Sequence, residues 1–522
     1  MNRLLLLPLA VCAAQASYLH GKNKPNIVLI MCDDMGFSDL GCYGSEINTP
    51  NIDRLADEGI RFSNFKNTGR SCPSRAALLT GRYQHEAGIG WMAEVDEHRP
   101  GYRGQIDRKY PTIAELMKDC GYSTYMSGKW HVTTFGGFDA PNGSYPVQRG
   151  FDRYYGCLYG GGSYYKPSPI YNNLQKITEL PDDYYYTTAL SDSAIAFVER
   201  HDTDKPMFLY VAHYAPHLPL EAPEKYIQRC MDRYKPGYDV LRKKRFEKMK
   251  SLGLVDKDME LPVFDKEFKG KRPKWEELNE AQRQKWTRDM ATYAAMIEIM
   301  DECIGELMQA IDKKGMTDNT VFIFLSDNGS TSEGGFIKQL MADLSNTPYR
   351  SYKQWVFQGG TSSPLIMKFG KDTGIEPKEE ICCQTSHIID LVPTCLKLAG
   401  GKYRKSKDIT GLEGISLLPA IENGECKDRT LFFEHQSSCA IIDGNWKLVR
   451  QNSNEQWELI DLSKDPFETN DISKMHPEIV ERLEAKWVEW GNTHKVFPLE
   501  NKPWGERINF YKEKNPDQDG IN

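Results

Sequence analysis

The chain alternates between apolar runs typical of buried strands and amphipathic helical segments, and this alternation limits the possible folds more than any other feature. The first run, NIVLIMC at 26–32, is continuously apolar, as expected for a strand covered on both faces of a parallel sheet. Helical patterns follow at about 51–59 and 111–121, and further strand-like runs lie at 122–128, 206–212, 319–326 and 362–369. We therefore predict an α/β fold with a large, mostly parallel central sheet sandwiched by helices.

The pattern changes near residue 410. Short alternating segments at 431–435, 439–450 and 456–462 predict antiparallel strands, with Asp443-Gly444 as a hairpin turn and a helix at 475–491. This indicates a smaller C-terminal α+β domain. The predicted organisation is a large domain at 23–420, the small domain at 421–510 and a tail at 511–522. The highly charged stretch 228–290 is predicted to be exposed helix and loop.

The N-terminus is typical of a targeting segment. Arg3 precedes the short apolar stretch 4–12, and Ala14-Gln15-Ala16 fits a cleavage site, so we predict a signal peptide at 1–16 and a periplasmic or secreted protein. The apolar stretch is too short to span a bilayer; a buried N-terminal strand and a lipoprotein anchored through Cys12 are the less favoured alternatives. Cleavage leaves twelve of the thirteen cysteines, an even number that permits disulfides but assigns none. The net charge of −7 argues against a nucleic-acid partner.

Polar side chains follow two of the predicted strands. Asp33 and Asp34 end the first strand, and Asp327 and Asn328 end the one at 319–326. Carboxylate and amide oxygens suit calcium or magnesium, and ligands of α/β sheets bind at the carboxyl ends of strands. Asp-Asn-Gly is also a common turn signal, so each pair alone has a purely structural explanation.

A second set of polar residues follows two other strands. Lys129 and His131 come after the strand at 122–128, and His217 comes after the strand at 206–212. Together they could bind a tetrahedral anion and protonate a leaving group, although a single loop histidine is more often structural. The remaining weaker candidates are His85, His213 and His435.

The segment GRSCPSRAALLTGR at 69–82 predicts a short helix from Pro73 to Leu79 that ends at Gly81. The N-terminus of a helix attracts anions through its free amides and its dipole. Ser71 lies just before this helix and Arg75 lies one turn into it. The alternative role for Ser71 is an ordinary N-cap.

This segment resembles the signature of the type I sulfatases of the alkaline phosphatase superfamily: Cys or Ser, any residue, Pro-Ser-Arg, three residues, then Leu-Thr-Gly. The proline sets the register, so Ser71 and not Cys72 occupies the position that the family oxidises to formylglycine (3-oxoalanine). The resemblance extends over nearly the whole chain and identifies a serine-type enzyme of the kind found in anaerobic bacteria, matured by a serine-type formylglycine-generating enzyme. It implies the α/β sandwich with a smaller C-terminal domain.

The resemblance also implies the roles of the site residues. Calcium would be bound by Asp33, Asp34, Ser71 in its modified form, Asp327 and Asn328. The hydrate at position 71 would attack sulfur, held by Arg75, while Lys129 and Lys353 would bind the sulfate. His131 would take a proton from the hydrate, and His217 would protonate the leaving alcohol. Gln358 stands where the family usually has glutamate, which puts only a local structural role in doubt.

The expected function is that of an exported sulfatase acting on carbohydrates, exo-acting on sulfated galactose or amino sugars of host mucin or glycosaminoglycan. The tyrosine-rich stretch 151–173 could contact sugar or form a packed loop, and 434–438 could bring the C-terminal domain to the rim of the pocket. The alternatives are a phosphodiesterase or phosphonate monoester hydrolase of the same superfamily, and a non-catalytic glycan-binding protein if Ser71 is unmodified. The last alternative is an exported structural protein.

Overall fold

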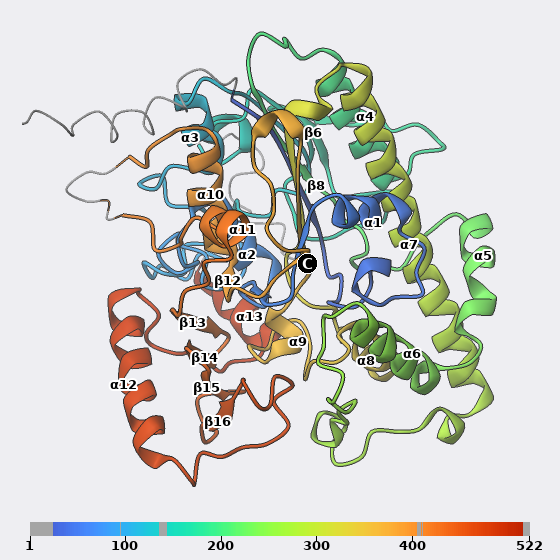
Figure 1. Ribbon diagram of the computed structural model, residues 1–522, viewed down its shortest axis with the longest axis vertical. Coiled ribbons are helices and arrows are strands. Elements are labelled where there is room, and N and C mark those ends of the chain that lie inside the picture. Colours follow the sequence, from blue (N-terminus) through green and yellow to red (C-terminus); the bar gives the residue numbers. More distant parts are fainter. Residues whose placement is uncertain (1–23, 94, 135–142, 405–408, 410, 515–522) are drawn as a thin grey trace, which may run out of the picture.

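A ten-stranded sheet forms the centre of the protein in the computed structural model, which describes residues 24–93, 95–134, 143–404, 409 and 411–514 (Figure 1). The predicted signal peptide and residues 515–522 of the predicted tail lie outside this range. The strands, in spatial order, are β11 (Ile381–Cys382), β2 (Ile60–Phe62), β10 (Leu365–Phe369), β9 (Thr320–Ser326), β1 (Asn26–Cys32), β8 (Met207–Ala212), β4 (Ser123–Gly128), β5 (Arg153–Cys157), β6 (Ile170–Asn172) and β7 (Gln175–Ile177). From β9 to β5 all neighbours are parallel, whereas β10 runs antiparallel to β9 and β2. The prediction of a mostly parallel central sheet is confirmed.

Helices cover both faces of this sheet because its central strands are apolar on both sides. Ile27, Leu29 and Met31 of β1 point into one core, and the alternate residues of the same strand point into the other. The first core is covered by α2 (Ser71–Thr80), α3 (Ile113–Asp119), α10 (Leu391–Leu398) and α11 (Leu418–Asn423). The second is covered by α1 (Pro50–Asp57), α4 (Tyr186–Glu199), α5 (Glu224–Tyr234), α6 (Tyr238–Ser251), α7 (Glu280–Lys313) and α8 (Phe336–Ser345). The strands β3 (Phe65–Lys66) and β12 (Ser386–His387) pair separately, and α9 (Gln358–Thr361) is a single turn.

The prediction that 228–290 is exposed is wrong for one face of α6. This helix buries Leu241, Phe246 and Met249, and it also buries Arg242 and Arg245. The Arg245 side chain is fully buried because two carboxylates, Asp39 and Glu46, pair with it. The run of charged residues in the sequence therefore gave no sign of a buried face, because that face of α6 carries arginines as well as apolar side chains.

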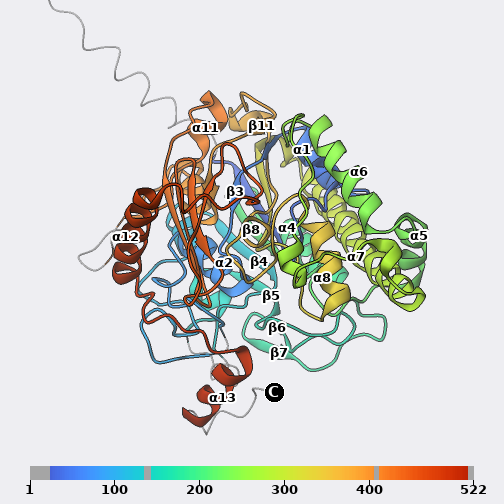
Figure 2. The same cartoon turned by 90° about the horizontal axis from the view of Figure 1, so that it is seen from below.

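The C-terminal part forms a four-stranded antiparallel sheet, as predicted. Its strands are β13 (Thr430–His435), β14 (Ser438–Asp443), β15 (Trp446–Arg450) and β16 (Glu458–Asp461), paired in chain order, and α12 (Pro477–Thr493) packs against the middle two. Asp443 pairs with Trp446 across the predicted hairpin, where Gly444 has a φ of 60°. Figure 2 shows α12 on the opposite side of the molecule from α5, and α13 (Trp504–Lys514) at its lower edge. The boundary at 420/421 stays a prediction.

Two sequence questions have answers within the described part of the chain. None of the helices there is long and apolar enough to cross a membrane. The twelve described cysteines are all free thiols.

Candidate active site

The parallel register brings the predicted polar residues to one edge of the large sheet. Cys32 at the end of β1 pairs with Ser326 at the end of β9, and Gly128 at the end of β4 pairs with Ala212 at the end of β8. Each of these strands is followed by candidate residues from the sequence. Loops that are far apart in the chain meet here because parallel strands end at the same edge of the sheet.

Three carboxylates and one amide meet at the ends of β1 and β9. Asp33, Asp34, Asp327 and Asn328 are buried. The Asn328 Nδ2 donates to Asp34 Oδ1 over 2.7 Å, and the Asp34 backbone amide donates to Asp327 Oδ1 over 3.3 Å. Within the described residues, Asp33 Oδ1 and Asn328 Oδ1 are buried without a hydrogen-bond partner. Two buried oxygens without hydrogen-bond partners, in a group of residues that offers oxygen ligands, fit a hard cation such as Ca²⁺.

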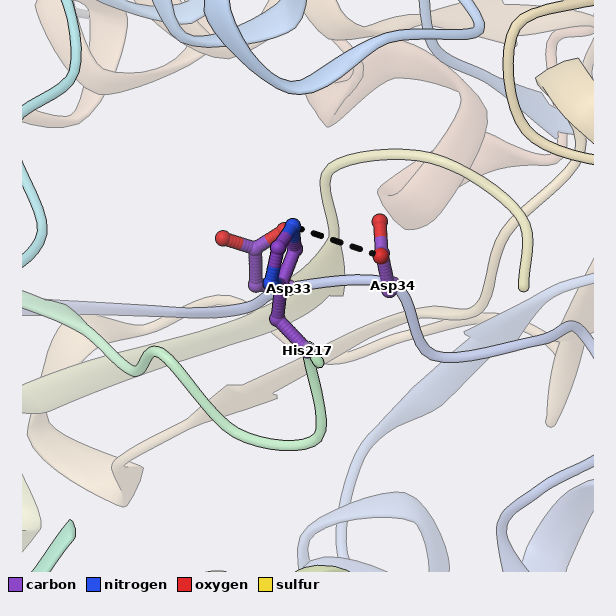
Figure 3. A group of neighbouring side chains, drawn as sticks. All are labelled: Asp33, Asp34 and His217. Atoms are coloured by element: carbon purple, nitrogen blue, oxygen red, sulfur yellow. Dashed lines mark ion pairs between the residues drawn. The ribbon is translucent and has the colours of Figure 1, made fainter. Parts of the chain in front are cut away.

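His217 lies beside the same carboxylates (Figure 3). One ligand atom each from Asp33, Asp34 and His217 lie within 4.8 Å of one another, and the His217 Nε2 is 3.6 Å from Asp34 Oδ2. The His217 Nδ1 is 2.6 Å from the Leu218 carbonyl oxygen, which can only accept, so Nδ1 carries the hydrogen and Nε2 faces the site. Burial and the nearby Lys353 ammonium lower the pKa of His217 to about 3.

Three cations surround the carboxylates. The Arg75 guanidinium bridges Asp33 and Asp327 at 3.2 and 3.0 Å, and its Nε donates to the Ser71 hydroxyl over 3.0 Å. Lys129 is ion-paired with Asp33 and donates to the Gly160 carbonyl over 2.9 Å. Lys353 lies 2.9 Å from Asp34 Oδ2 and 3.3 Å from His217 Nε2.

The pKa values of the three carboxylates are shifted in different directions because their charged neighbours differ. Burial raises the pKa of Asp33, but Lys129, His217 and Arg75 outweigh it and hold that pKa well below its usual range. At Asp34 burial prevails over Lys353, and the pKa is raised. Burial and the charge of Asp33 raise the pKa of Asp327 to about 6 against the opposing effect of Arg75. A cation bound between them would relieve this repulsion.

The helix α2 begins at Ser71, two residues earlier than predicted, and ends at Thr80, with Gly81 as its C-cap at a φ of 66°. Arg70 holds the N-cap position, so the sequence-based alternative of Ser71 as an N-cap is not what the structure shows. The Ser71 side chain instead accepts its hydrogen bond from Arg75, four residues along the same helix. The hydroxyl is therefore held at the edge of the carboxylate cluster.

His131 lies against the first turn of α2. Its Nε2 is 3.2 Å from the Cys72 Sγ, and its backbone has a φ of 55°. A Cβ on Gly160 would lie 2.3 Å from the His131 Cε1, so a larger residue there would displace the ring. Positive φ at His131 and also at Asp34 (63°) places two strained residues in the site, as is common at functional centres.

The three weaker histidine candidates are all buried. The His85 ring pairs with Glu434 of β13 at 2.7 Å. His213 is buried, and burial lowers its pKa to about 3. His435 ends β13 and is also buried.

The tyrosine-rich stretch is mainly packing. Tyr154, Tyr164 and Tyr171 belong to the two cores, and the Tyr164 hydroxyl donates to the Tyr214 and His217 carbonyls. It thus supports the loop that carries His217. The packed-loop interpretation explains these three residues.

At the position where the family usually has glutamate, Gln358 accepts a hydrogen bond of 2.5 Å from the buried Lys66. Burial and the nearby Lys447 lower the pKa of Lys66 to about 7. Gln358 thus has a local structural role away from the carboxylate cluster.

Sequence reasoning missed Glu333 and Arg70. Glu333 pairs with Lys353 at 3.2 Å and with Arg70 at 2.7 Å. Glu333 lies in the loop that begins with Asp327, and Arg70 precedes Ser71, so adjacency to predicted site residues was the available signal. The contact of Lys129 with the Gly160 carbonyl could not be predicted from the sequence, because every residue has a backbone oxygen.

The comparisons with known proteins agree with this geometry. The sulfatase family model matches residues 25–401, and a model described as N-sulphoglucosamine sulphohydrolase, C-terminal, matches residues 350–492. The chain is 32% identical to an arylsulfatase of Klebsiella aerogenes over 78% of this chain and 96% of that one, and 27% identical to an N-acetylgalactosamine-6-O-sulfatase of Bacteroides thetaiotaomicron over 92% and 98%. The crystal structure of Ps i-CgsB in complex with k-i-k-neocarrahexaose superposes with a TM-score of 0.68 at 26% identity, covering 95% of this chain and 99% of that one. The chain belongs to the sulfatase family, whose members hydrolyse sulfuric esters, and it has the alkaline phosphatase-like fold of that family.

Proposed function

We propose that this protein is an exported sulfatase that removes sulfate from a sugar, using Ser71 in its formylglycine form. The observation that carries the proposal is the position of Ser71. It shares Arg75 with Asp33 and Asp327, at the sheet edge where Lys129, Lys353 and His217 also meet. This set provides a nucleophile position, fixed cations and a histidine in one buried centre.

The charges of the site suit a sulfate ester. Its leaving alkoxide is poor and needs an acid, and charge builds up on the sulfuryl oxygens during transfer. Lys129 and Lys353 would orient these oxygens once the ester displaces their contacts with Asp33 and Asp34. The Arg75 guanidinium would keep the side chain at position 71 in line.

Asp33, Asp34, Asp327 and Asn328 would hold a calcium ion together with modified position 71. Bound there, the ion would stabilise negative charge on the sulfuryl group. Oxidation of Ser71 would supply a geminal diol in water, which can attack sulfur and later release sulfate by returning to the aldehyde. An unmodified serine would remain as a stable sulfated serine.

His217 would protonate the leaving alcohol through Nε2, because Nδ1 is committed to the Leu218 carbonyl. Its pKa of about 3 reflects burial and Lys353. A bound sulfate monoanion beside Lys353 opposes that positive charge and favours protonated His217. His131, on the side of Cys72, would take the proton from position 71.

Carbohydrate substrates are supported by the relatives, of which one is named an N-acetylgalactosamine-6-O-sulfatase and another was solved with a neocarrahexaose. Export rests on the sequence of residues 1–16. The competing function within the same superfamily is hydrolysis of phosphate diesters or phosphonate monoesters. It predicts the opposite preference between sulfate and phosphate esters.

The deciding experiment combines mass spectrometry with turnover assays on the full chain co-expressed with a serine-type maturase. We expect a loss of two hydrogens at Ser71 in the peptide 69–75, and release of sulfate from monosulfated galactose or N-acetylhexosamines. Ser71→Ala should lower turnover by about 10³-fold or more without unfolding the protein.

Cys72→Ala is the matched control and should keep the modification. Modification at Cys72, or wild-type turnover by Ser71→Ala, would refute the assignment of the nucleophile. Faster turnover of phosphate than of sulfate esters by modified protein would support the competing function.

A further inference from the structure

A cavity of about 250 Å³ lies between the carboxylate site and the C-terminal sheet. It is lined by Arg70, Trp91, Glu333, Gln354, Gln436 and Pro503. We propose that this cavity binds the sugar ring that carries the sulfate, that the ring is an uncharged hexose or N-acetylhexosamine, and that Gln354 and Gln436 determine this specificity. The proposal rests on the sulfatase function proposed above.

The residues that line the cavity adjoin the reacting centre. Arg70 directly precedes Ser71, and Gln354 directly follows Lys353. Glu333 lies 3.2 Å from the Lys353 Nζ, which is in turn 3.3 Å from the His217 Nε2. A sulfuryl group held by Lys353 therefore has its sugar next to these walls.

Two glutamines from separate parts of the chain meet in the cavity. The Gln354 Nε2 donates to the Gln436 Oε1 over 3.1 Å, which joins the loop after Lys353 to the turn between β13 and β14. Both residues have a left-handed backbone, with φ of 87° and 50°, which side chains with a Cβ rarely adopt. The Gln354 backbone N–H donates to the Gly69 carbonyl over 2.7 Å, and this bond holds the backbone of Gln354 in place.

The turn that carries Gln436 is also fixed. The Ser437 backbone amide donates to Glu434 Oε1 over 2.6 Å, and Glu434 in turn pairs with the buried His85. The C-terminal sheet thus contributes Gln436 from a rigid turn, as the sequence segment 434–438 had suggested. Preorganised polar groups of this kind favour specific binding, because less freedom is lost when the ligand arrives.

The charges in the cavity favour an uncharged ring. Arg70 and Glu333 pair at 2.7 Å, and the Arg70 and Lys353 charges hold the pKa of Glu333 well below its usual range, although the side chain is partly removed from solvent. Glu333 is therefore a carboxylate that neutralises the guanidinium, and a second carboxylate on the ring would be repelled. The two side-chain amides can bind hydroxyl or acetamido groups of such a ring.

The size of the cavity limits the ligand to a single ring. Pockets for drug-sized molecules measure about 300–1,000 Å³, so a cavity of about 250 Å³ holds one sugar ring, and any further sugars would lie outside it. Trp91 is held by the Arg507 guanidinium, 3.7 Å above its ring centre, so enlarging the cavity would require breaking that contact. A terminal sugar is the fitting ligand.

The test compares sugar sulfates with a small aryl sulfate on the same variants. We expect Gln436→Ala and Gln354→Ala to raise KM for a monosulfated N-acetylhexosamine or galactose by 10-fold or more, and to change kcat/KM for 4-nitrophenyl sulfate by less than twofold. A monosulfated hexuronic acid should be turned over at least 10-fold less efficiently than the neutral sugars by wild-type protein. Gln228→Ala, at an exposed glutamine of α5, is the matched control and should change neither substrate.

Unchanged KM for the sugar sulfates in both glutamine variants would overturn the proposal, and so would an equal loss on the sugar and aryl substrates, which means damage to the sulfuryl site. A preference for the hexuronic acid would overturn the charge argument. Binding of the same sugar sulfates to the Ser71→Ala protein, measured by calorimetry, separates the two proposals. If wild type hydrolyses no sulfate ester but the Gln436→Ala change still weakens binding 10-fold, the sulfatase function fails while the ring site stands.

Discussion

Two buried charge clusters lie close together in this protein, and they are built differently. The structural cluster consists of Arg245, Asp39 and Glu46, and all its polar atoms have partners. The three guanidinium nitrogens of Arg245 bind Asp39, Glu46 and Ser38, and the remaining Asp39 oxygen accepts from Tyr293 and Gly36. The strand-end cluster of Asp33, Asp34, Asp327 and Asn328 keeps two buried oxygens without partners among the described residues.

The difference shows how a structural cluster can be told from a functional one. Both clusters are buried and contain carboxylates, so burial and charge alone do not separate them. A cluster that serves only the fold satisfies its hydrogen bonds internally, because each open buried atom costs free energy. The strand-end cluster instead keeps open oxygens, a strained Asp34 and crowded negative charge, which a bound cation would compensate.

Calcium should distinguish the clusters most strongly. We expect calcium to stabilise chelator-treated wild-type protein by about 2.7 kcal/mol at a hundredfold excess over its Kd, because it binds only the folded site. Asp33→Asn should remove this stabilisation and lower sulfate-ester turnover by about 10³-fold or more, since it removes one charged ligand and the partner of Lys129. Calorimetric unfolding with and without calcium measures the first effect. A calcium response in Asp33→Asn equal to that of wild type would remove the distinction.

Stability should respond next, and at the other cluster. Arg245→Met should destabilise the fold by about 3–5 kcal/mol, because it leaves the buried Asp39 and the partly buried Glu46 without their counter-charge. Arg229→Met is the matched control, since Arg229 is half exposed beside Glu298 and Glu302 and should cost about 1 kcal/mol or less. Thermal unfolding in the presence of calcium measures both. Equal losses of unfolding free energy in the two variants would show that the ion pairs of Arg245 do not stabilise the fold more than an exposed pair does.

The smallest effect concerns a pair outside both clusters. Burial lowers the pKa of His494, but its hydrogen bond to Glu413 prevails, and the pKa is raised above 6.5. The protonated pair therefore stabilises the fold fully below pH 6.5, and this contribution is lost as pH rises through the raised pKa. His494→Gln should cost about 0.5–1 kcal/mol at pH 6 and less at pH 8.5. Melting temperatures of His494→Gln across this range should show a flatter pH dependence than those of wild type or of the control His476→Gln, at a partly exposed histidine. An unchanged slope would contradict the assignment.

Much of the fold could be predicted because its signals are local. The buried run at 26–32, the strand-end aspartates and the hairpin at Asp443-Gly444 are each contained in a few adjacent residues. The prediction that 228–290 is exposed failed for α6 because a run of charged residues does not show which face of a helix packs against the core. Arg245 is buried only because Asp39 and Glu46, some two hundred positions earlier in the chain, lie opposite it.

The sequence by itself determined the chemical types of the site: a serine in a specific signature, oxygen ligands after strands, and lysines and histidines at neighbouring strand ends. These follow from residue identity and spacing. Only the tertiary structure decided that Arg75 bridges Ser71 to two carboxylates, that Glu333 joins Lys353 to Arg70, and that Gln436 from the C-terminal sheet meets Gln354 beside them. The physical reason is that strand order and packing set these distances, and neither is written in any single stretch of residues.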